Sequence, residues 1–283
     1  MSGEIQKIGF IGAGNMAEAI LGAVISAGLY PPERIRISDI EPARVRHMQE
    51  KYRIADAGAN HTVIRECDLI FLSVKPQTLP SVLERLVREN VFSAPAGKKK
   101  LVSIAAGIRL AAIEAFIYEG LTEDQKLMLP IIRVMPNTPA LVRSGTSAVC
   151  ANAYAAAGDL ETVKSILSVM GRVFQCRESE MNAFTAVAGS GPAYGFYLIE
   201  AMAEAGAQLG IAPEDALNMT RSTLEGTLKL LEAQQAGPEE LRKKVTSPGG
   251  TTEAAIRVLE DNQVKSRLID AVLAAARRAE ELS

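Results

Sequence analysis

The sequence contains only two histidines, His47 and His61, and three cysteines, Cys67, Cys150 and Cys176, among its 283 residues. Two histidines leave little material for a histidine-based zinc site or a Ser–His catalytic relay. The cysteines are odd in number and form no Cys-x-x-Cys pair, which indicates free, reduced thiols. These absences exclude most hydrolase and metalloenzyme mechanisms, and we expect no bound metal and a cytoplasmic location.

The chain also lacks a surplus of positive charge, since 31 Lys and Arg residues face 33 Asp and Glu residues. Proteins that bind nucleic acids normally carry a basic surplus, so no nucleic-acid partner is expected. No apolar run reaches the ~20 residues of a membrane helix. The run that comes closest, Ile8–Ile25, is interrupted by Asn15, Glu18 and several glycines, so we expect no membrane contact. A hydrophobic content of 48% supports a large core, and the length favours about two domains.

Short apolar runs alternate with helix-length segments in the first half of the chain. Continuous apolar runs such as Asp68–Val74 are typical of parallel strands that are buried on both faces. The alternation predicts a doubly wound, mostly parallel α/β sheet. The expected strands are 7–11, 34–38, 68–74, 100–104 and 131–135, with weaker ones at 147–151 and 172–176.

No strand pattern follows Cys176, and helical stretches dominate the rest of the chain. Gly210, Gly237 and the Pro248-Gly249-Gly250 cluster interrupt these stretches. The sequence therefore predicts an α/β domain over residues 1–176 and an all-α domain over residues 177–283. The expected helices are 180–209, 213–235, 238–245 and 252–283, with internal breaks.

A glycine-rich segment, Gly12-Ala13-Gly14-Asn15-Met16-Ala17, directly follows the first expected strand and opens a helix. The first glycine permits a tight turn, the second lets the backbone approach a pyrophosphate, and Ala17 allows close packing of helix on strand. The alternative is a tight turn with a purely structural role. The position between a strand and a helix favours a Rossmann-type dinucleotide site.

The second expected strand ends in Ser38-Asp39, where such a domain meets the adenosine ribose. An acid there usually binds both ribose hydroxyls and repels a 2′-phosphate, which favours NAD(H). Ser38, Arg44 and Asn60 are an alternative set that would bind the phosphate of NADP(H). Asp39 could also cap the helix that begins at Pro42. The sequence leaves the choice between NAD(H) and NADP(H) open.

Later strand ends supply further residues at the same edge of the sheet, because ligands of open α/β sheets bind outside the carboxyl ends of the strands. The segments Val74-Lys75-Pro76 and Ala105-Ala106-Gly107 are therefore expected to line the cofactor, although a solvated role is equally open for Lys75. Two prolines fix the loop after the strand 131–135, where Asn137 could address an amide of the cofactor.

The helical half contains two unusual clusters. The small residues of Gly189-Ser190-Gly191-Pro192-Ala193 favour close helix packing over a ligand site. The segment 246–252, Thr-Ser-Pro-Gly-Gly-Thr-Thr, gathers hydroxyls and backbone N–H groups at a helix start. This composition suits a carboxylate. The alternative is an ordinary helix-capping turn.

Taken together, these motifs resemble those of pyrroline-5-carboxylate reductases, in the same order and from about Lys7 to Glu281. The resemblance implies reduction of 1-pyrroline-5-carboxylate, a small cyclic imine, to L-proline with NAD(P)H, the last step of proline synthesis. It also implies a Rossmann domain and a helical domain that forms a homodimer, often assembled into a decamer of five dimers. The segments that carry it are 12–17, 74–76, 104–107, 133–139, 189–194 and 247–252.

The same resemblance assigns individual roles. Besides the glycine segment, it gives the cofactor Ser38, Asn60, Ser73, Val74, Lys75, Pro76, Ile104, Ala105 and Ala106. It gives the substrate Ser247, Gly250, Thr251, Thr252 and, at the domain junction, Glu178. Thr252 is the expected catalytic residue, as the hydrogen-bond partner of the ring nitrogen. A protonated imine is already a strong hydride acceptor, so neither histidine nor metal is required. Asp39 departs from the members that prefer NADP.

Two other functions fit parts of the sequence. A hydroxyacid dehydrogenase of the same architecture would need a lysine on the helix that follows Gly189-Ser190-Gly191, and none occurs between Met181 and Ala216. A non-catalytic dinucleotide-binding module has no need for the hydroxyl-rich segment 247–252.

Overall fold

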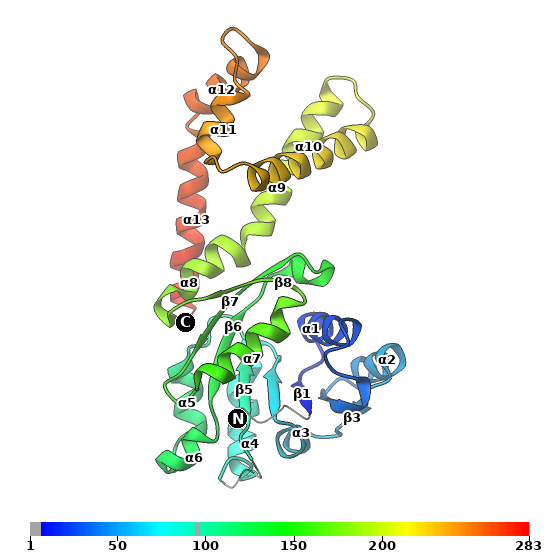
Figure 1. Cartoon of the computed structure of the whole chain (residues 1–283), viewed down its shortest axis with the longest axis vertical. Coiled ribbons are helices and arrows are strands. Elements are labelled where there is room, and N and C mark those ends of the chain that lie inside the picture. Colours follow the sequence, from blue (N-terminus) through cyan, green and yellow to red (C-terminus); the bar gives the residue numbers. More distant parts are fainter. Residues whose placement is uncertain (1–6, 94, 96, 283) are drawn as a thin grey trace. The chain divides into compact units, whose positions relative to one another are not determined.

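The computed structural model describes residues 7–93, 95 and 97–282, and it divides into two compact units (Figure 1). The first unit contains the residues up to Gly189 together with those from Ala276 onward, and the second contains Ser190–Ala275. The boundary expected after Cys176 lies inside the first unit. The reason is packing, since Met181 is fully buried in the same apolar cluster as the first unit's helices.

An eight-stranded sheet forms the centre of the first unit, in the order β3-β2-β1-β4-β5-β6-β7-β8. All neighbouring strands are parallel except β6 and β7. The expectation of a doubly wound, mostly parallel sheet is thus confirmed. The strands are β1 (Ile8–Ile11), β2 (Ile35–Ser38), β3 (Ala55–Asp56), β4 (Leu69–Leu72), β5 (Lys100–Ser103), β6 (Ile131–Met135), β7 (Gly145–Ala151) and β8 (Gly171–Gln175).

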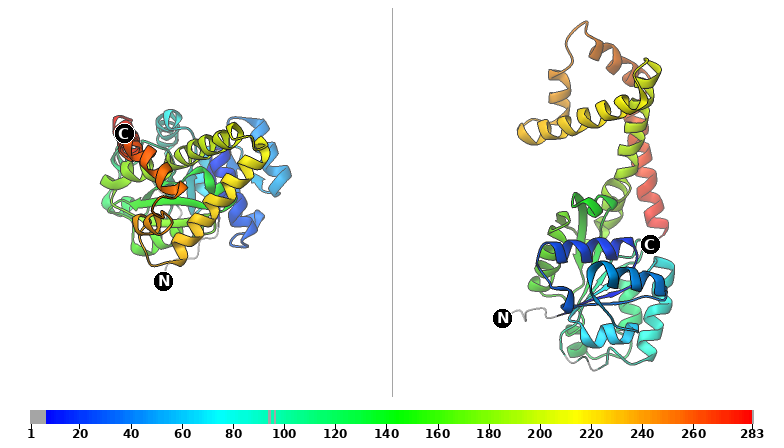
Figure 2. Two further views of the ribbon diagram at one scale, coloured as in Figure 1. Left: turned by 90° about the horizontal axis from the view of Figure 1, so that it is seen from above. Right: turned by 90° about the vertical axis from the view of Figure 1, so that its right-hand side faces the viewer.

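Helices cover both faces of this sheet (Figures 1 and 2). One apolar cluster joins a sheet face to α1 (Asn15–Ser26), α2 (Pro42–Tyr52) and α7 (Ala157–Ser168). A second cluster joins the other face to α3 (Asn60–Glu66), α4 (Leu79–Arg88) and α5 (Leu110–Ile117). The short helix α6 (Glu123–Leu127) precedes β6. Because the central strands β1, β4 and β5 are buried on both faces, the loops at their carboxyl ends form the surface that is free for a ligand.

The chain leaves the sheet through α8 (Met181–Phe184) and a π-helical turn over Thr185–Gly189. Five helices follow, and the last of them runs from the second unit into the first. Within the described residues no strand follows Gln175, so the expected helical C-terminal half is confirmed. The helices are α9 (Gly191–Gln208), α10 (Pro213–Ala233), α11 (Pro238–Lys244), α12 (Thr251–Asp261) and α13 (Val264–Glu281).

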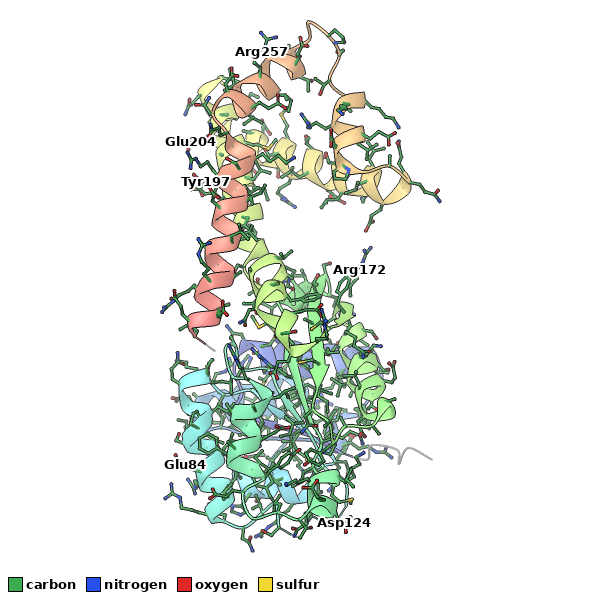
Figure 3. The ribbon with its side chains drawn as sticks, turned by 90° about the vertical axis from the view of Figure 1, so that its left-hand side faces the viewer. Glu84, Asp124, Arg172, Tyr197, Glu204 and Arg257 are labelled. Carbon is green, nitrogen blue, oxygen red and sulfur yellow. The ribbon has the colours of Figure 1, made fainter. Side chains whose placement is uncertain are left out.

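The second unit leaves many large apolar side chains open. Phe196 and Tyr197 of α9 are 67% and 76% exposed, and Figure 3 labels Tyr197 on its helix. Close packing is seen between α9 and α10, where a Cβ added to Gly206 would lie 2.8 Å from the Cβ of Ala216. A surface this apolar is typical of a protein–protein interface.

Leu282, directly after α13, belongs to the first unit. A Cβ added to Gly107 would lie only 2.7 Å from the carbonyl oxygen of Leu282. Gly107 also has a φ of +77°, which side chains rarely adopt. Leu282 therefore packs closely on the loop between β5 and α5.

Candidate functional site

Gly12 brings the carboxyl ends of three strands together. Its φ is +102°, and an added Cβ would lie 2.7 Å from the carbonyl carbon and oxygen of Ser73, after β4. Its N–H donates a hydrogen bond of 2.8 Å to the carbonyl oxygen of Ser38, at the end of β2. Only glycine fits this turn, because any side chain would meet backbone that cannot move aside.

The space around Gly14 is open, in contrast to that around Gly12, because a Cβ added to Gly14 would meet no atom within 4 Å. Gly14 is the N-cap of α1, and no side chain caps this helix. The first N–H groups of a helix have no partner within it and attract negative charge. An open cradle of backbone N–H groups fits a pyrophosphate, while Ala17, 1% exposed, packs the helix against the sheet. The residues present therefore fit a dinucleotide.

Asp39 connects the end of β2 to this cradle. Its Oδ2 accepts a hydrogen bond of 2.5 Å from the N–H of Ala13, and its Oδ1 accepts one of 2.8 Å from the N–H of Glu41. Helix α2 has Glu41 as its N-cap and no side-chain cap, so Asp39 is not the cap that the sequence allowed. Beside it, the buried Ser38 hydroxyl donates to Oδ1 of Asn60 over 2.7 Å.

The ends of β4 and β5 lie at the same edge of the sheet. Ser73 Oγ is 3.1 Å from the carbonyl oxygen of Gly12, to which it donates, and the N–H of Ile104 donates to the carbonyl oxygen of Leu72 over 3.2 Å. Lys75 is exposed at the start of the short helix Pro76–Thr78. Val74 is half-buried, Ala105 is buried and Ala106 is exposed. The expected cofactor residues of these loops thus lie on elements that end at the cradle, and their contacts with a cofactor remain a prediction.

The side-chain amide of Asn137 is largely used within the protein. Its Oδ1 accepts from the N–H of Thr146 over 2.8 Å, and its Nδ2 donates to the carbonyl oxygen of Ala188 over 2.9 Å. Asn137 is 8% exposed. Its observed role is to join the loop after β6 to β7 and to the π-helical turn. The expected contact with a cofactor amide remains a prediction, with one amide hydrogen available for it.

Glu178 is also engaged within the first unit. Its Oε1 lies 3.0 Å from Nη1 of Arg133 and accepts a hydrogen bond of 2.6 Å from the N–H of Leu110, at the start of α5. The side chain of Arg133 is 3% exposed. This ion pair was not predicted from the sequence, although an arginine inside the apolar run Ile131–Met135 was a signal for it. A substrate contact of Glu178 remains a prediction.

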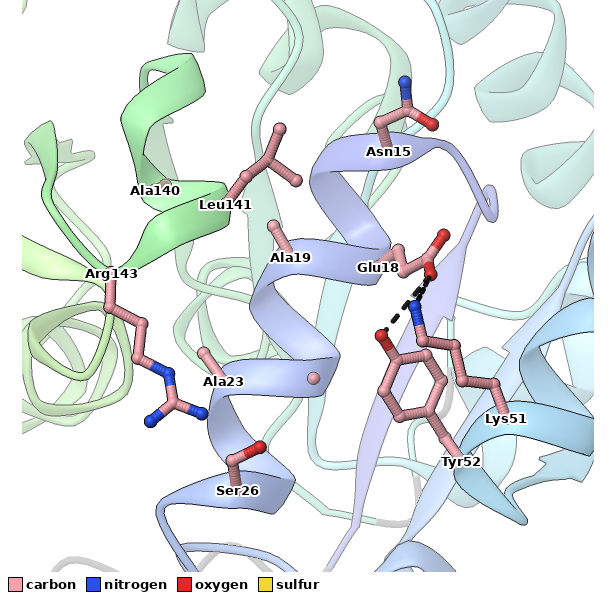
Figure 4. A pocket seen from close by; sticks show the side chains of 11 residues that line it. Asn15, Glu18, Ala19, Ala23, Ser26, Lys51, Tyr52, Ala140, Leu141 and Arg143 are labelled. Carbon is pink, nitrogen blue, oxygen red and sulfur yellow. Dashed lines mark hydrogen bonds and ion pairs between the residues drawn. The ribbon is translucent and has the colours of Figure 1, made fainter. Parts of the chain in front are cut away.

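Hydrogen-bonding side chains surround Glu18 in the first turn of α1, beside a pocket, and Figure 4 shows two of them, Lys51 and Tyr52. Oε1 of Glu18 lies 2.9 Å from both His47 Nε2 and Lys51 Nζ, and its Oε2 lies 2.8 Å from Arg44 Nη2. Burial raises the pKa of Glu18, but hydrogen bonds from His47, Lys51 and Arg44 outweigh this and lower the pKa to about 2. Glu18 is therefore ionised at neutral pH and joins α1 to α2.

The hydroxyl-rich segment 247–252 lies in the second unit, as a turn that leads into α12. The N–H of Gly250 donates to the carbonyl oxygen of Ser247 over 3.1 Å, and Gly249 has a φ of +72°. Helix α12 begins at Thr251, with Gly250 as N-cap and no side-chain cap. The capping alternative for Thr252 is therefore wrong, and its hydroxyl is not needed to start the helix.

This turn also carries a carboxylate, since Oε2 of Glu253 accepts a hydrogen bond of 2.8 Å from the N–H of Gly249. The uncapped N–H groups of the first turn of α12 remain suited to an anion. Thr251 is exposed and Thr252 is half-buried. The assignments of Ser247, Gly250, Thr251 and Thr252 to a substrate remain predictions.

The residues that the structure describes contain no cluster of three or more His, Cys, Asp or Glu side chains that could hold a metal ion. None of their helices is long and apolar enough to cross a membrane. The three cysteines are free thiols, and burial raises the pKa of Cys67 and of Cys150 to about 12. These two side chains are therefore protonated and unreactive at neutral pH.

Models of two protein families match the chain. Residues 178–282 match the dimerisation domain of pyrroline-5-carboxylate reductase, and residues 7–107 match the family described as NADP oxidoreductase, coenzyme F420-dependent. The two matches cover the helical half and the glycine-rich part of the sheet domain.

Related proteins and structures cover nearly the whole chain. It is 38% identical over 280 residues to a pyrroline-5-carboxylate reductase of Pseudomonas aeruginosa, covering 98% of this chain and 97% of the relative. A structure of such a reductase from Coxiella burnetii matches with a TM-score of 0.87 and 34% identity over 99% of both chains. The Plasmodium falciparum structure, with NADP bound, has a TM-score of 0.84 and 28% identity over 98% of this chain and 97% of that one. The chain therefore belongs to the pyrroline-5-carboxylate reductase family.

Proposed function

We propose that this protein reduces 1-pyrroline-5-carboxylate to L-proline with NAD(P)H, as the last step of proline synthesis. The observation that carries the proposal is the turn 247–252, which leads into a helix that no side chain caps. The same chain also has an open glycine cradle. The cradle fits a dinucleotide, whereas the turn offers hydroxyls and N–H groups to a small carboxylate. The family to which the chain belongs combines these two features in one enzyme.

The residues of the turn have separate tasks in this proposal. When bound in the cradle, NAD(P)H supplies the hydride. The N–H groups at the start of α12 bind the substrate carboxylate, and the hydroxyl of Thr252 accepts a hydrogen bond from the protonated ring nitrogen. The protonated imine then needs no metal and no acidic side chain to accept a hydride, so positioning is the main contribution of the protein.

The exposed apolar helices support a homodimer. Leu209, directly after α9, is 83% exposed, and Leu228 of α10 is 63% exposed. We infer that a second copy of the chain covers such side chains, that five dimers assemble into a decamer, and that the enzyme works in the cytoplasm. The dimerisation-domain match over residues 178–282 supports the first of these steps.

Neither alternative function is favoured. The helix α9 carries no lysine for the acid–base role of a hydroxyacid dehydrogenase. A binding module without catalysis does not account for the hydroxyls of Thr251 and Thr252 at a helix start that no side chain caps.

The test is oxidation of NADH and of NADPH by the purified protein, with and without 1-pyrroline-5-carboxylate, and L-proline measured as the product. We expect substrate-dependent oxidation that treatment with EDTA does not change. Binding of cofactor without any turnover of the imine would overturn the proposed reaction. Loss of activity in EDTA that zinc restores would contradict its metal independence.

A further inference from the structure

The carboxylate of Asp39, at the end of β2, is relevant to the choice between NADH and NADPH. Asp39 follows this strand, and its two carboxylate oxygens accept hydrogen bonds from the N–H groups of Ala13 and Glu41 over 2.5 and 2.8 Å. These two bonds fix the orientation of the carboxylate beside the glycine cradle. In folds of this type, an acid at this position binds the 2′-hydroxyl of the adenosine ribose.

The groups that could neutralise a 2′-phosphate are already engaged. Arg44 Nε donates to the carbonyl oxygen of Ala13 over 2.9 Å, and its Nη2 lies 2.8 Å from Oε2 of Glu18. Ser38 Oγ donates to Asn60 Oδ1 over 2.7 Å. A phosphate at this place would therefore meet the carboxylate of Asp39 first, with the nearby guanidinium already paired to another carboxylate.

The side chain next to Asp39 is apolar and exposed. Ile40 is 93% exposed, directly after Asp39. An isolated exposed isoleucine is common, but this one adjoins the ribose position, where an adenine ring would cover its apolar surface.

We propose that Asp39 makes this protein prefer NADH over NADPH, through hydrogen bonds to the ribose hydroxyls and repulsion of the 2′-phosphate. The inference deepens the proposed function and rests on its cofactor site. It separates this chain from the Plasmodium falciparum relative, whose structure was solved with NADP bound. A hydrogen bond to a charged group typically changes an equilibrium constant by about 10- to 150-fold, which sets the size of the expected preference.

The experiment measures the Kd of NADH and of NADPH by fluorescence titration, in the absence of the imine. We expect the unmodified protein to bind NADH at least about tenfold more tightly than NADPH. Asp39→Asn keeps the size of the side chain and an acceptor oxygen but removes the charge. It should lower the NADH preference by about tenfold or more. Glu41→Gln removes a carboxylate two residues away and should leave the preference unchanged within about twofold.

Two results would overturn the inference: equal or tighter binding of NADPH by the unmodified protein, or an unchanged preference in Asp39→Asn. If Asp39→Asn does not fold, Asp39→Ser serves as the second variant, and competition by adenosine 2′-phosphate against adenosine 5′-phosphate on the unmodified protein gives an independent measurement. Failure of the proposed reaction is distinguishable, because the binding ratio is measured without the imine.

Discussion

Arg133 and Glu178, far apart in the chain, form an ion pair at 3.0 Å in which the arginine side chain is 3% exposed. The same carboxylate oxygen accepts the N–H of Leu110 and so holds the start of α5. This contact joins β6, the segment after β8, and the helix that follows the loop 104–109. Glu178 therefore has a structural task in the first unit, whatever its relation to a substrate.

Removal of this carboxylate should destabilise the protein. Glu178→Ala leaves a buried guanidinium without its partner, and we expect the free energy of unfolding to fall by about 3 kcal/mol. Glu178→Gln keeps an acceptor oxygen and should lose less. Chemical denaturation of both variants measures the effect. Unchanged stability together with a raised KM for the imine would instead favour the substrate role that the resemblance implied.

Gly14 offers a test of the cofactor cradle that does not disturb the fold. A Cβ at this position meets no atom within 4 Å, and its φ of −68° suits any residue. Gly14→Val should therefore melt near the temperature of the unmodified protein. Its side chain would fill the space where the backbone approaches the pyrophosphate, so affinity for reduced nicotinamide cofactors should fall by about tenfold or more. Unaltered cofactor affinity would place the dinucleotide elsewhere.

Thr252→Ala tests the expected catalytic residue. Loss of a hydrogen bond to a charged group costs ~1.5–3 kcal/mol, which corresponds to a fall in kcat/KM of roughly 10- to 150-fold. Cofactor affinity and melting temperature should change little, because Gly250 is the N-cap of α12 and no side chain caps that helix.

A matched control for Thr252 is Thr246→Ala. The hydroxyl of Thr246 donates to the carbonyl oxygen of Arg242 over 2.7 Å, within the backbone of the preceding helix. This variant should keep normal kcat/KM. Normal kinetics in Thr252→Ala, measured beside it, would reject the catalytic assignment.

Glu18 should make stability depend on pH in the acid range. Its pKa is lowered from 4.5 to about 2 in the folded protein, so its contribution is complete above about pH 4.5 and is lost as the pH falls towards 2. We expect Glu18→Gln to cost about 2 kcal/mol at pH 7 and almost nothing at pH 2. Unfolding by urea at several pH values measures this difference. Glu161→Gln, in an exposed pair with Lys164, should change stability little at any pH.

The exposed apolar surface of the second unit predicts a dimer. A single charged substitution on that surface should weaken it. Phe196→Asp places a carboxylate at a side chain that is 67% exposed in a single chain, and we expect it to shift the protein from dimer to monomer in light scattering. Glu204→Gln, on the same helix, should leave the dimer intact. An unmodified protein that is monomeric and folded at micromolar concentration would contradict the homodimer itself.

Sequence patterns predicted the parts of the fold that depend on local hydrophobicity. The strand 131–135 was predicted with the bounds that the structure has, and the start of α2 was predicted at Pro42, where it is found. The strand β3 was missed, because it has only two residues, Ala55 and Asp56, and both are exposed. The direction of β7 was not predicted either, since neighbouring strands with the same apolar pattern can be parallel or antiparallel.

The residues of the candidate site also differ in whether a local sequence pattern could predict them. Gly12 and Gly14 were predicted from their spacing and from their position between a strand and a helix, because their roles depend on the local backbone. The partner of Arg133 and the cluster around Glu18 depend on contacts between distant segments, which no local pattern encodes. The hydrogen bond from the N–H of Ala13 to Asp39 is also a contact between distant segments. It favours NADH over NADPH, the choice that the sequence left open.

The contact of Leu282 with the first unit has a consequence for the synthesis of the protein. Leu282 packs on Gly107, in the loop after β5, although the whole second unit separates these residues in the chain. Contacts between such distant residues form late, because a long loop must close first. During synthesis on the ribosome, the sheet can assemble while this loop still lacks its last neighbour. The segment expected to line the cofactor is thus completed only after the entire second unit has been translated.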